Sequence, residues 1–452
     1  MSPLIVQKRP DLLVDYSLSS ENTSQSGLSS AGHWARTTLK KYSSNGVVRS
    51  VRPSETIRRA TRVMAEVGIT KVADVTGLDR VGIPNFMSVR PRDSEPGISY
   101  YNGKGTTRAD AHAGALMEAI ERHAAEACEY KIVIGSFAKL KDENCCISPS
   151  EIIVPQVREC SDDLVLEWIA GYDLLNDRET LVPLNTVLCP YCPKSRPVIF
   201  FSSSNGLASG NTRQEALCHA LCEIIERDAQ AMVMARLQLR PAIQDLLESH
   251  QGPAVDEPLR VISLKGLPRR ATKLVKRLRD AGLSVYLRDL TGTSGIATID
   301  CTIVSEDAPT SSAYGGCGCH PDARVALLRA ITEAAQSRLT CIQGGREDLP
   351  QILSRNRSGE FKIESIFGKT KKISFREIPS YKNLSIDEDL EVLLRALPAS
   401  GLDRAIAFDL TRREVGIPVV RVIVPRAETW TVFHLHTGRA AIGPRISEVL
   451  CQ

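Results

Sequence analysis

The 452-residue chain contains no long hydrophobic run. A membrane-spanning helix needs about 18 or more consecutive apolar residues, and no stretch of this sequence approaches that length. The first residues, MSPLIVQKRPDLLVDYS, also lack the apolar core of a secretory signal peptide. We therefore expect a cytoplasmic protein that has no membrane partner.

The sequence also has little net charge. The 57 lysines and arginines nearly balance the 53 aspartates and glutamates, and the net charge of +4 is spread along the chain. A nucleic-acid-binding protein usually concentrates positive charge on one face, so this balance argues against such a partner. The 13 cysteines do not form the framework of a small secreted domain, which agrees with a reducing cytoplasm.

Common catalytic signatures are missing. The eight histidines show no ligand spacing such as HExxH, and no side-chain nucleophile has a convincing base beside it. The segment CPYC, residues 189–192, has the spacing of a metal or redox pair. A zinc site would need a second pair, from CGC at 317–319 or from Cys145 and Cys146. Sulfur handling is a further alternative for Cys189 and Cys192, and an incidental loop is the interpretation that we favour.

Serine, threonine and asparagine dominate residues 17–50. Such a composition buries too little apolar surface to offset the entropy of ordering, so we expect a mobile tail over 1–50 and one domain over 51–452. In that domain, strand-like runs alternate with helical stretches rich in alanine, leucine and glutamate, which predicts an α/β (α+β) fold. The expected strands are KIVIGSF, LVLEWIAGYDL, PVIFFSS, LSVYLRDL, IATIDCTIV, RAIAFDL and IPVVRVIVP.

A repeat organises the domain. Residues 105–122, GTTRADAHAGALMEAIER, match residues 210–227, GNTRQEALCHALCEIIER, at ten of eighteen positions. A weaker third copy, DARVALLRAITEAAQSR, spans 322–338 and places Glu333 and Gln336 where the full copies have two glutamates. Repeats of this size predict duplicated sheet-plus-helix modules. Three modules around one centre would bring three acidic helix faces together.

Both full copies place two glutamates three residues apart inside an apolar helix, Glu118 with Glu121 and Glu223 with Glu226. The predicted capping threonine lies eleven residues before the first glutamate, about 16 Å along the helix axis, so the helix N-terminus does not explain them. A solvated face with arginine partners would explain one copy. Two equivalent copies favour a cation site, because converging carboxylates hold hard cations such as Mg²⁺.

The segment NGKG, residues 102–105, precedes the first of these helices. It lacks Walker A spacing, and a turn is the simplest interpretation. Beside an acidic helix, however, Lys104 and free backbone N–H groups would face a polyphosphate. After the third helix, Gly344 and Gly345 are predicted to end it.

Three segments, SYYNGKGTTRADAHAGALMEAIER, SSNGLASGNTRQEALCHALCEIIERD and ARVALLRAITEAAQSR, resemble the ATP-binding segments of the YcaO superfamily, and the resemblance covers roughly residues 55–430. It implies a YcaO-like fold in which repeated modules surround a central Mg-ATP site. Such proteins use ATP to phosphorylate a backbone amide oxygen of a peptide, and a nucleophile then attacks the carbonyl carbon. A neighbouring Cys, Ser or Thr gives an azoline ring, whereas an external sulfide equivalent gives a thioamide, commonly with a TfuA partner.

The resemblance implies ATP and Mg²⁺ as cofactors and assigns residues to each. The implied Mg²⁺ ligands are Glu118, Glu121, Glu223 and Glu226. The residues implied around ATP are Asn211, Glu215, Arg227, Arg329 and Glu333, and we add Lys104, Gln336 and Arg338 because they lie near the motifs. Helix capping is an alternative role for Glu215, and no catalytic residue is assigned.

Two departures bear on the reaction. The family motif often has a serine four residues before the first glutamate, where this chain has Gly114. Azoline-forming members often end in a proline-rich tail, and this sequence ends in ISEVLCQ, which favours thioamide formation in a ribosomally made peptide or protein. The alternatives are an azoline-forming cyclodehydratase, a non-catalytic nucleotide-binding scaffold and a small-molecule ATP-dependent ligase. Beside the peptide substrate, a TfuA-like or leader-binding protein and a second copy of the chain are the candidate partners.

Overall fold

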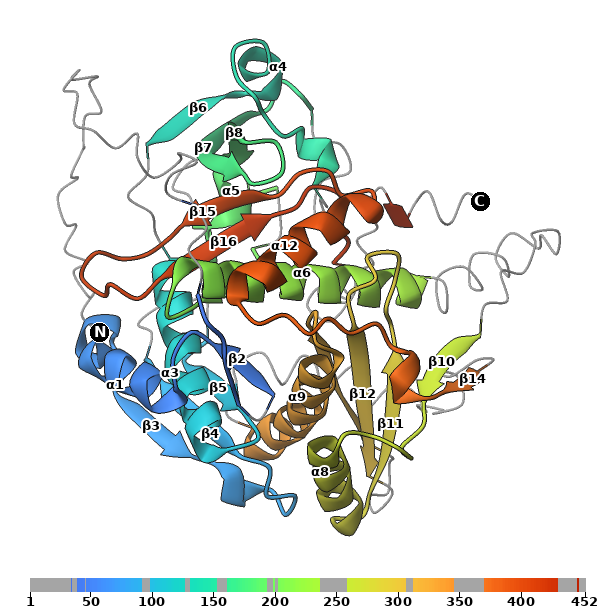
Figure 1. Cartoon of the computed structure of the whole chain (residues 1–452). Helices are drawn as coiled ribbons and strands as arrows, with labels where there is room; N and C mark the ends of the chain where they lie inside the picture. Colours follow the sequence, from blue (N-terminus) through green and yellow to red (C-terminus); the bar gives the residue numbers. More distant parts are fainter. Residues whose placement is uncertain are drawn as a thin grey trace, which may run out of the picture.

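Helices and strands alternate along the chain, which confirms the α/β class (Figure 1). The computed structural model describes residues 34, 39–44, 46–91, 98–126, 131–152, 161–192, 198–199, 202–235, 258–305, 312–344, 370–429 and 445–446. The helices in these residues are α1 (Pro53–Arg62), α2 (Met64–Val67), α3 (Arg108–Ala124), α4 (Phe137–Leu140), α5 (Leu184–Val187), α6 (Arg213–Met234), α8 (Arg269–Asp280), α9 (Ala323–Gln343) and α12 (Ile386–Ala399).

The strands in the described residues form one hairpin and three larger sheets. The hairpin joins β1 (Tyr42–Ser44) to β2 (Val47–Arg49), and the three-stranded sheet has the order β3 (Lys71–Asp74), β4 (Asn85–Val89), β5 (Tyr100–Lys104). The five-stranded sheet has the order β13 (Ser312–Cys319), β12 (Thr298–Ser305), β11 (Leu283–Asp289), β10 (Leu259–Ile262), β14 (Thr370–Ile373). The six-stranded sheet has the order β6 (Ile132–Ser136), β7 (Val165–Asp173), β15 (Ile406–Asp409), β16 (Val419–Ile423), β9 (Leu207–Ser209), and β8 (Arg178–Pro183) also pairs with β7.

Each copy of the repeat is one strand, one turn and one helix. The three units are β5–α3, β9–α6 and β13–α9, with turns at 105–107, 210–212 and 320–322. Each strand stands at the end of its own sheet's order, so the three modules belong to three different sheets. The predicted caps Thr107 and Thr212 accept hydrogen bonds from the backbone N–H groups of Asp110 and Glu215. The repeat therefore predicts the local unit correctly, and tertiary packing decides the sheet that each unit joins.

Strand glycines allow the repeat helices to pack directly on the strand backbone. A Cβ atom at Gly103 would lie 2.0 Å from the Ala111 carbonyl oxygen, and one at Gly316 would lie 2.1 Å from the Ala334 nitrogen. Residues 102–104 therefore belong to β5, with Gly103 against α3 and the Lys104 side chain on the opposite face beside Glu333, so the expected turn or phosphate loop at NGKG is wrong for these three residues. The small residues of α3 likewise admit this strand rather than a ligand, because a Cβ atom at Gly114 would lie 3.3 Å from the Gly103 Cα atom.

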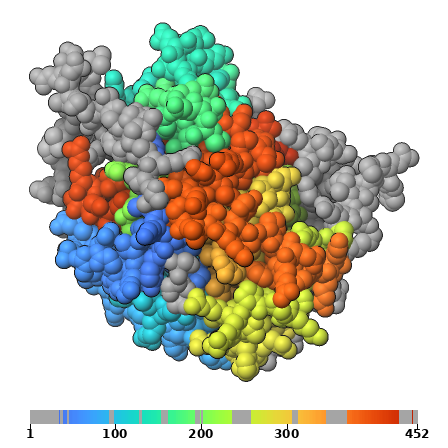
Figure 2. Space-filling view, in the orientation of Figure 1, coloured from blue at the N-terminus to red at the C-terminus, as the bar shows by residue number. Residues whose placement is uncertain are grey.

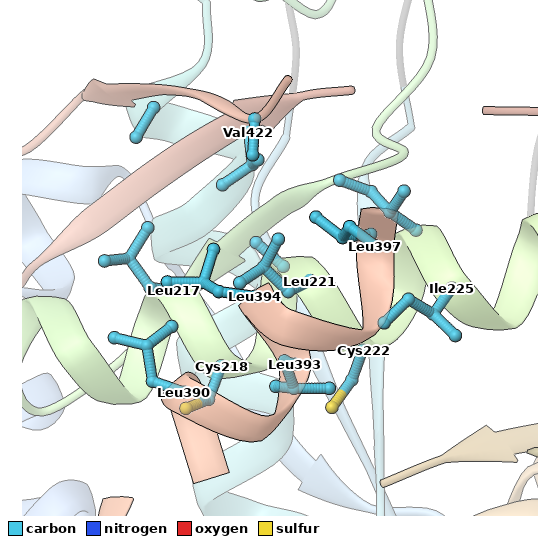
Figure 3. Close-up of a cluster of buried hydrophobic side chains, with 14 of the residues drawn as sticks. Leu217, Cys218, Leu221, Cys222, Ile225, Leu390, Leu393, Leu394, Leu397 and Val422 are labelled. Atoms are coloured by element: carbon cyan, nitrogen blue, oxygen red, sulfur yellow. The ribbon is translucent and has the colours of Figure 1, made fainter. Parts of the chain in front are cut away.

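Helix α6 crosses the middle of the molecule, with α3 and α9 on the same side of it (Figure 1). Its apolar side chains pack on α12 and β16, where Leu221 and Ile225 lie among Leu393, Leu397 and Val422 (Figure 3). In the space-filling view, α12 and the C-terminal strands, in orange, hide most of α6 (Figure 2). Because it is covered by protein on several sides, α6 holds Glu226 in the interior and Glu223 half-buried.

Part of the expected N-terminal tail belongs to the folded domain. Trp34 is buried in the core cluster that contains α6 and α12. The Leu39 N–H group donates to Asp387 at 2.8 Å, and Lys41 forms an ion pair with Asp389 at 2.5 Å. The expectation of a mobile tail is therefore wrong for residues 34, 39–44 and 46–50, because a few apolar and charged side chains find specific partners on α12. Residues 1–33, 35–38 and 45 lie outside the described residues.

Six of the seven predicted strands are present as β6, β7, β11, β12, β15 and β16. The described residues of the seventh, 198–199 and 202–203, are not in a strand, and 197 and 200–201 lie outside the described part. Helix α9 ends at Gln343, and Gly344 takes the predicted left-handed cap conformation with φ of 65°. Within the described ranges, no helix is both long and apolar enough to cross a membrane.

Removing residues 1–50 should destabilise the protein, because the deletion exposes the surface that Trp34 covers and removes the partners of Asp387 and Asp389. Trp34→Ala alone should cost about 3 kcal/mol of unfolding free energy, and a protein that starts at Val51 should lose more. Urea unfolding of the full chain, the truncated chain and the Trp34→Ala variant tests this. Equal midpoints for the full and truncated chains would show that the docking contributes nothing.

Candidate functional site

The glutamates of the two full repeats meet at the centre of the molecule. Glu118 and Glu121 of α3 lie close enough to Glu223 of α6 to repel it electrostatically. Glu226, one turn further along α6, interacts instead with Glu333 of α9. Helix α6 therefore presents one carboxylate to each neighbouring repeat helix, and the predicted convergence of three acidic helix faces is present.

Glu121 is held where a bare carboxylate is unfavourable. Burial, with a further contribution from Glu118, raises its pKa to about 8. Its Oε2 atom accepts hydrogen bonds from the backbone N–H group of Ser209 at 2.9 Å and from the Ser209 hydroxyl at 3.3 Å. Strand β9 of the second repeat thus fixes a glutamate of the first, which the sequence pattern did not reveal.

The glutamates on the α9 side differ in charge. Burial and the neighbouring Glu333 raise the pKa of Glu226 to about 7, and this side chain is 4% exposed. Burial also acts to raise the pKa of Glu333, but Lys104 and Arg227 outweigh it and lower that pKa below its ordinary value. Lys104 of β5 forms an ion pair with Glu333. Three repeats therefore contribute to one charged cluster, which brings together the predicted ATP-site residues Lys104, Arg227 and Glu333.

The outer glutamates face arginines of their own helices. The Glu118 Oε1 atom lies 3.9 Å from the Arg122 Nη2 atom, and the Glu223 Oε1 atom lies 3.8 Å from the Arg227 Nη2 atom. The buried Nε atoms of Arg122 and Arg227, and that of Arg329 on α9, have no hydrogen-bond acceptor in the described part of the chain. In the same part, no three His, Cys, Asp or Glu side chains are close enough to hold a metal ion in their present rotamers. The site nevertheless has the chemistry that magnesium and phosphate need, namely buried carboxylate oxygens beside guanidinium groups with unused donors.

Asn211 and Glu215 lie at the other end of α6. The Glu215 carboxylate, 1% exposed, accepts hydrogen bonds from Asn211 at 2.9 Å and from the Ser50 N–H and hydroxyl at 2.8 and 2.7 Å. Arg49 lies 3.7 Å from the same carboxylate. The alternative role of Glu215 as a helix cap is therefore wrong for its side chain, although its backbone N–H group is capped by Thr212. Arg49 and Ser50 were missed because they lie in the segment assigned to the tail.

Arg329 connects the two ends of the site. Its charge interacts with Glu226 and Glu333, and it also acts on His219 in the middle of α6. Burial, and then Arg329, lower the pKa of His219 to about 4, so this histidine is neutral at physiological pH. The predicted residues from Asn211 to Glu333 therefore line one continuous region beside α6.

Two residues predicted to lie near ATP, Gln336 and Arg338, contact other parts of the protein instead. Gln336 donates to the Asn102 carbonyl oxygen at 2.7 Å and joins α9 to β5. Arg338 donates to Asp79 at 3.1 Å, and its guanidinium lies 5.5 Å from the ring centre of Tyr314. These contacts give Gln336 and Arg338 structural roles in the present conformation.

Arg421 is a site residue that the sequence reasoning missed, and Cys189, for which an incidental loop was favoured, lies beside it. Arg421 is 3% exposed, and its charge interacts with Glu121 and Glu223. Arg122 donates to the Cys189 sulfur at 3.8 Å, while Cys192 is exposed. A single arginine inside the apolar strand VVRVI was the available signal. Because the described residues hold no cluster with zinc-ligand geometry, they give no support to the zinc alternative for CPYC.

Comparisons with known proteins follow the same segments. The family model described as "YcaO cyclodehydratase, ATP- and Mg²⁺-binding" matches residues 102–428. An uncharacterized protein of Methanothermobacter thermautotrophicus is 36% identical over 401 residues, which cover 86% of this chain and 97% of that protein. An uncharacterized protein in the tfuA 3′ region of Rhizobium leguminosarum bv. trifolii is 33% identical over 408 residues, 86% of this chain and 91% of that protein. The structure of YcaO from Methanopyrus kandleri bound with AMPPCP and Mg²⁺ has a TM-score of 0.67 and 25% identity, and covers 90% of this chain and 98% of that one.

The raised pKa of Glu121 predicts that the unfolding free energy of the metal-free protein depends on pH. Between its ordinary pKa of 4.5 and about 8, the folded state keeps a proton that the unfolded state has released. Stability from this group is therefore complete below pH 4.5 and is lost as the pH rises through 8. The Glu121→Gln variant should be more stable than the parent at pH 9, by an amount on the order of a few kcal/mol, and similar to it at pH 4. Urea unfolding in the presence of a chelator at both pH values tests this, and a constant difference between the proteins would contradict it.

Proposed function

The chain belongs to the YcaO family of ATP- and Mg²⁺-binding proteins, and on this premise we propose that it uses Mg-ATP to phosphorylate a backbone amide oxygen of a peptide, which sulfur then replaces to form a thioamide. This membership confirms the family that the sequence motifs resemble. The observation that carries the proposal is the partly buried cluster of carboxylates and cationic side chains from the three repeats.

We assign the Mg²⁺ sites to Glu118, Glu121, Glu223 and Glu226. Carboxylate oxygens are the protein ligands that Mg²⁺ prefers, and burial raises the pKa values of Glu121 and Glu226, so a bound cation would stabilise their ionised forms. When bound, the metal ions would neutralise charge on the phosphates during transfer. The four glutamates would orient these ions once the outer two turn from Arg122 and Arg227.

The arrangement of cations favours an elongated, polyanionic ligand. Arg227, Arg329 and Lys104 surround the carboxylates on the α9 side, where they would bind the phosphates. Asn211 and Glu215 would contact the other end of the nucleotide, because Glu215 and Glu226 are separated by about 16 Å along α6. The relative from Methanopyrus kandleri, which binds AMPPCP and Mg²⁺, supports this placement by its similarity over most of both chains.

The proposed reaction depends on positioning rather than on a nucleophilic side chain. An amide carbon is a poor electrophile, and its oxygen is a poor leaving group. Transfer of the γ-phosphoryl group to that oxygen produces a good leaving group, so sulfur can add to the carbon and phosphate can depart. The chain's part would be to hold the two substrates in line and to place positive charge where negative charge develops.

The choice of sulfur is favoured by a relative. The protein from Rhizobium leguminosarum is named for its place in the tfuA 3′ region, and a TfuA-like protein is the partner that we propose for this chain. The family description names cyclodehydration, so azoline formation on Cys, Ser or Thr is the second candidate. Both candidates share the phosphorylation step and differ only in the nucleophile.

The variants Glu118→Gln, Glu121→Gln, Glu223→Gln and Glu226→Gln should each fold and lose Mg-ATP affinity by about tenfold or more, because each keeps the side-chain shape and removes a ligand charge. Calorimetry with Mg²⁺ and a non-hydrolysable ATP analogue measures this. Glu391→Gln is the matched control, since Glu391 also faces an arginine one turn away, Arg395 at 3.4 Å, but lies on α12. Parent-like affinity in all four variants would overturn the metal assignment.

Mass spectrometry should separate the two reactions. With ATP, Mg²⁺, a sulfide source, the partner and the peptide, thioamide formation adds about 16 Da, because sulfur replaces oxygen, whereas azoline formation removes about 18 Da as water. We expect the gain. Loss of water would replace the thioamide proposal by the azoline one, and binding of nucleotide with no mass change would favour a scaffold.

A further inference from the structure

Strand β16 carries one charged residue in an otherwise apolar sequence, VVRVI. Arg421 stands opposite Leu207 of β9 and Phe408 of β15, so it lies between two paired strands in the six-stranded sheet. Its side chain is 3% exposed. An arginine in this position has no access to bulk water and must find its partners inside the protein.

The strand register shows where this side chain points. Val419 pairs with Ser209 and Arg421 pairs with Leu207, and directly paired residues share one face of a sheet. Val419 and Arg421 are two residues apart, so they also share a face. The Ser209 hydroxyl on that face contacts the Met117 carbonyl oxygen and Glu121 of α3. Arg421 therefore points toward α3 and the proposed metal ligands.

Only one of the three guanidinium nitrogens of Arg421 has a hydrogen-bond acceptor among the described residues. Its Nη2 atom donates to the Thr186 carbonyl oxygen at 2.8 Å, whereas Nε and Nη1 are buried with no acceptor among the described residues. Burial lowers its pKa to about 10, so it stays charged at neutral pH. Arg288 shows the usual arrangement, because it is also a buried strand arginine and its Nε and Nη2 atoms donate to Asp300 at 2.8 and 2.5 Å. An unused buried donor pair indicates that an anion completes the site.

We propose that Arg421, assisted by Arg122, binds the phosphoryl group as it passes from ATP to the amide oxygen. The inference rests on the proposed function and adds a catalytic residue to it. In the transfer, a lone pair of the amide oxygen forms the new O–P bond. The bond from phosphorus to the β–γ bridging oxygen breaks and its electrons leave on ADP. The amide N–H proton passes to water.

The position of Arg421 favours the transferred group over the nucleotide. Lys104, Arg227 and Arg329 serve the α9 side, where Glu226 and Glu333 lie. Arg421 and Arg122 lie on the α3 side, where the charges of both interact with Glu121, Glu223 and Cys189. The carboxylates thus have cations on both sides. One set would bind the nucleotide phosphates, and the other would bind the γ-phosphoryl group during its transfer.

The test uses a mimic of the transferred group and needs no peptide. Beryllium fluoride should strengthen Mg-ADP binding to the full-length parent protein, because it occupies the γ-phosphoryl position. In Arg421→Met, Mg-ADP affinity should stay within about threefold of the parent while most of this gain is lost. Guanidinium ions should restore part of the gain in Arg421→Met, which a purely structural role would not allow. Arg288→Lys, which keeps a cation beside Asp300, should behave as the parent.

The outcomes separate this inference from the function on which it rests. A full beryllium fluoride gain in Arg421→Met would overturn the role of Arg421 and leave the proposed function intact. Equal loss of Mg-ADP affinity with and without beryllium fluoride, in a variant with the parent melting temperature, would assign Arg421 to the nucleotide instead and also overturn the inference. A parent protein that binds no Mg-ADP would refute the proposed function, and the inference with it. With a peptide substrate, the expected effect on kcat is a loss of about 100-fold, with the KM for ATP nearly unchanged.

Discussion

Burial of like charges on one central helix is the constraint on which the rest of the structure depends. Helix α6 is packed against α12 and β16, and it holds Glu226 in the interior and Glu223 half-buried. Buried carboxylates are costly unless cations or strong hydrogen bonds compensate them. The arginines one turn along α3 and α6, the lysine at the end of β5 and the Ser209 N–H group provide this compensation. The raised pKa values of Glu121 and Glu226 show that it is incomplete.

In the repeats, close packing of strand on helix holds these charged side chains in place. Gly103 and Gly316 remove the side chains that would hold the strands away from α3 and α9, so helix and strand backbones touch. Each helix start is anchored by a cap, which fixes the rotation that turns its glutamates inward. The result is a set of charged side chains held by rigid elements, as the proposed phosphoryl transfer would require.

The N-terminal segment shows how an apparently dispensable stretch joins this arrangement. Ser50 donates twice to Glu215, and Arg49 lies beside the same carboxylate. The contacts of Leu39 and Lys41 with α12 hold this segment in place. Composition suggested a tail because low hydrophobicity measures how much surface a segment can bury, and it does not report specific hydrogen bonds to distant residues.

Local physical chemistry determined much of this protein from the sequence alone. Helical periodicity, capping threonines and repeated glutamates predicted α3 and α6, their acidic faces and their convergence, because each signal acts within a few turns. Tertiary structure alone decided which sheet each repeat joins, that NGKG is a strand and not a loop, and that Arg338 pairs with Asp79. It also decided that Arg421, more than 180 residues beyond the end of α6, faces the same carboxylates. Those outcomes depend on contacts between residues far apart in the chain, and a single sequence carries no local signal for which distant groups will share a buried space.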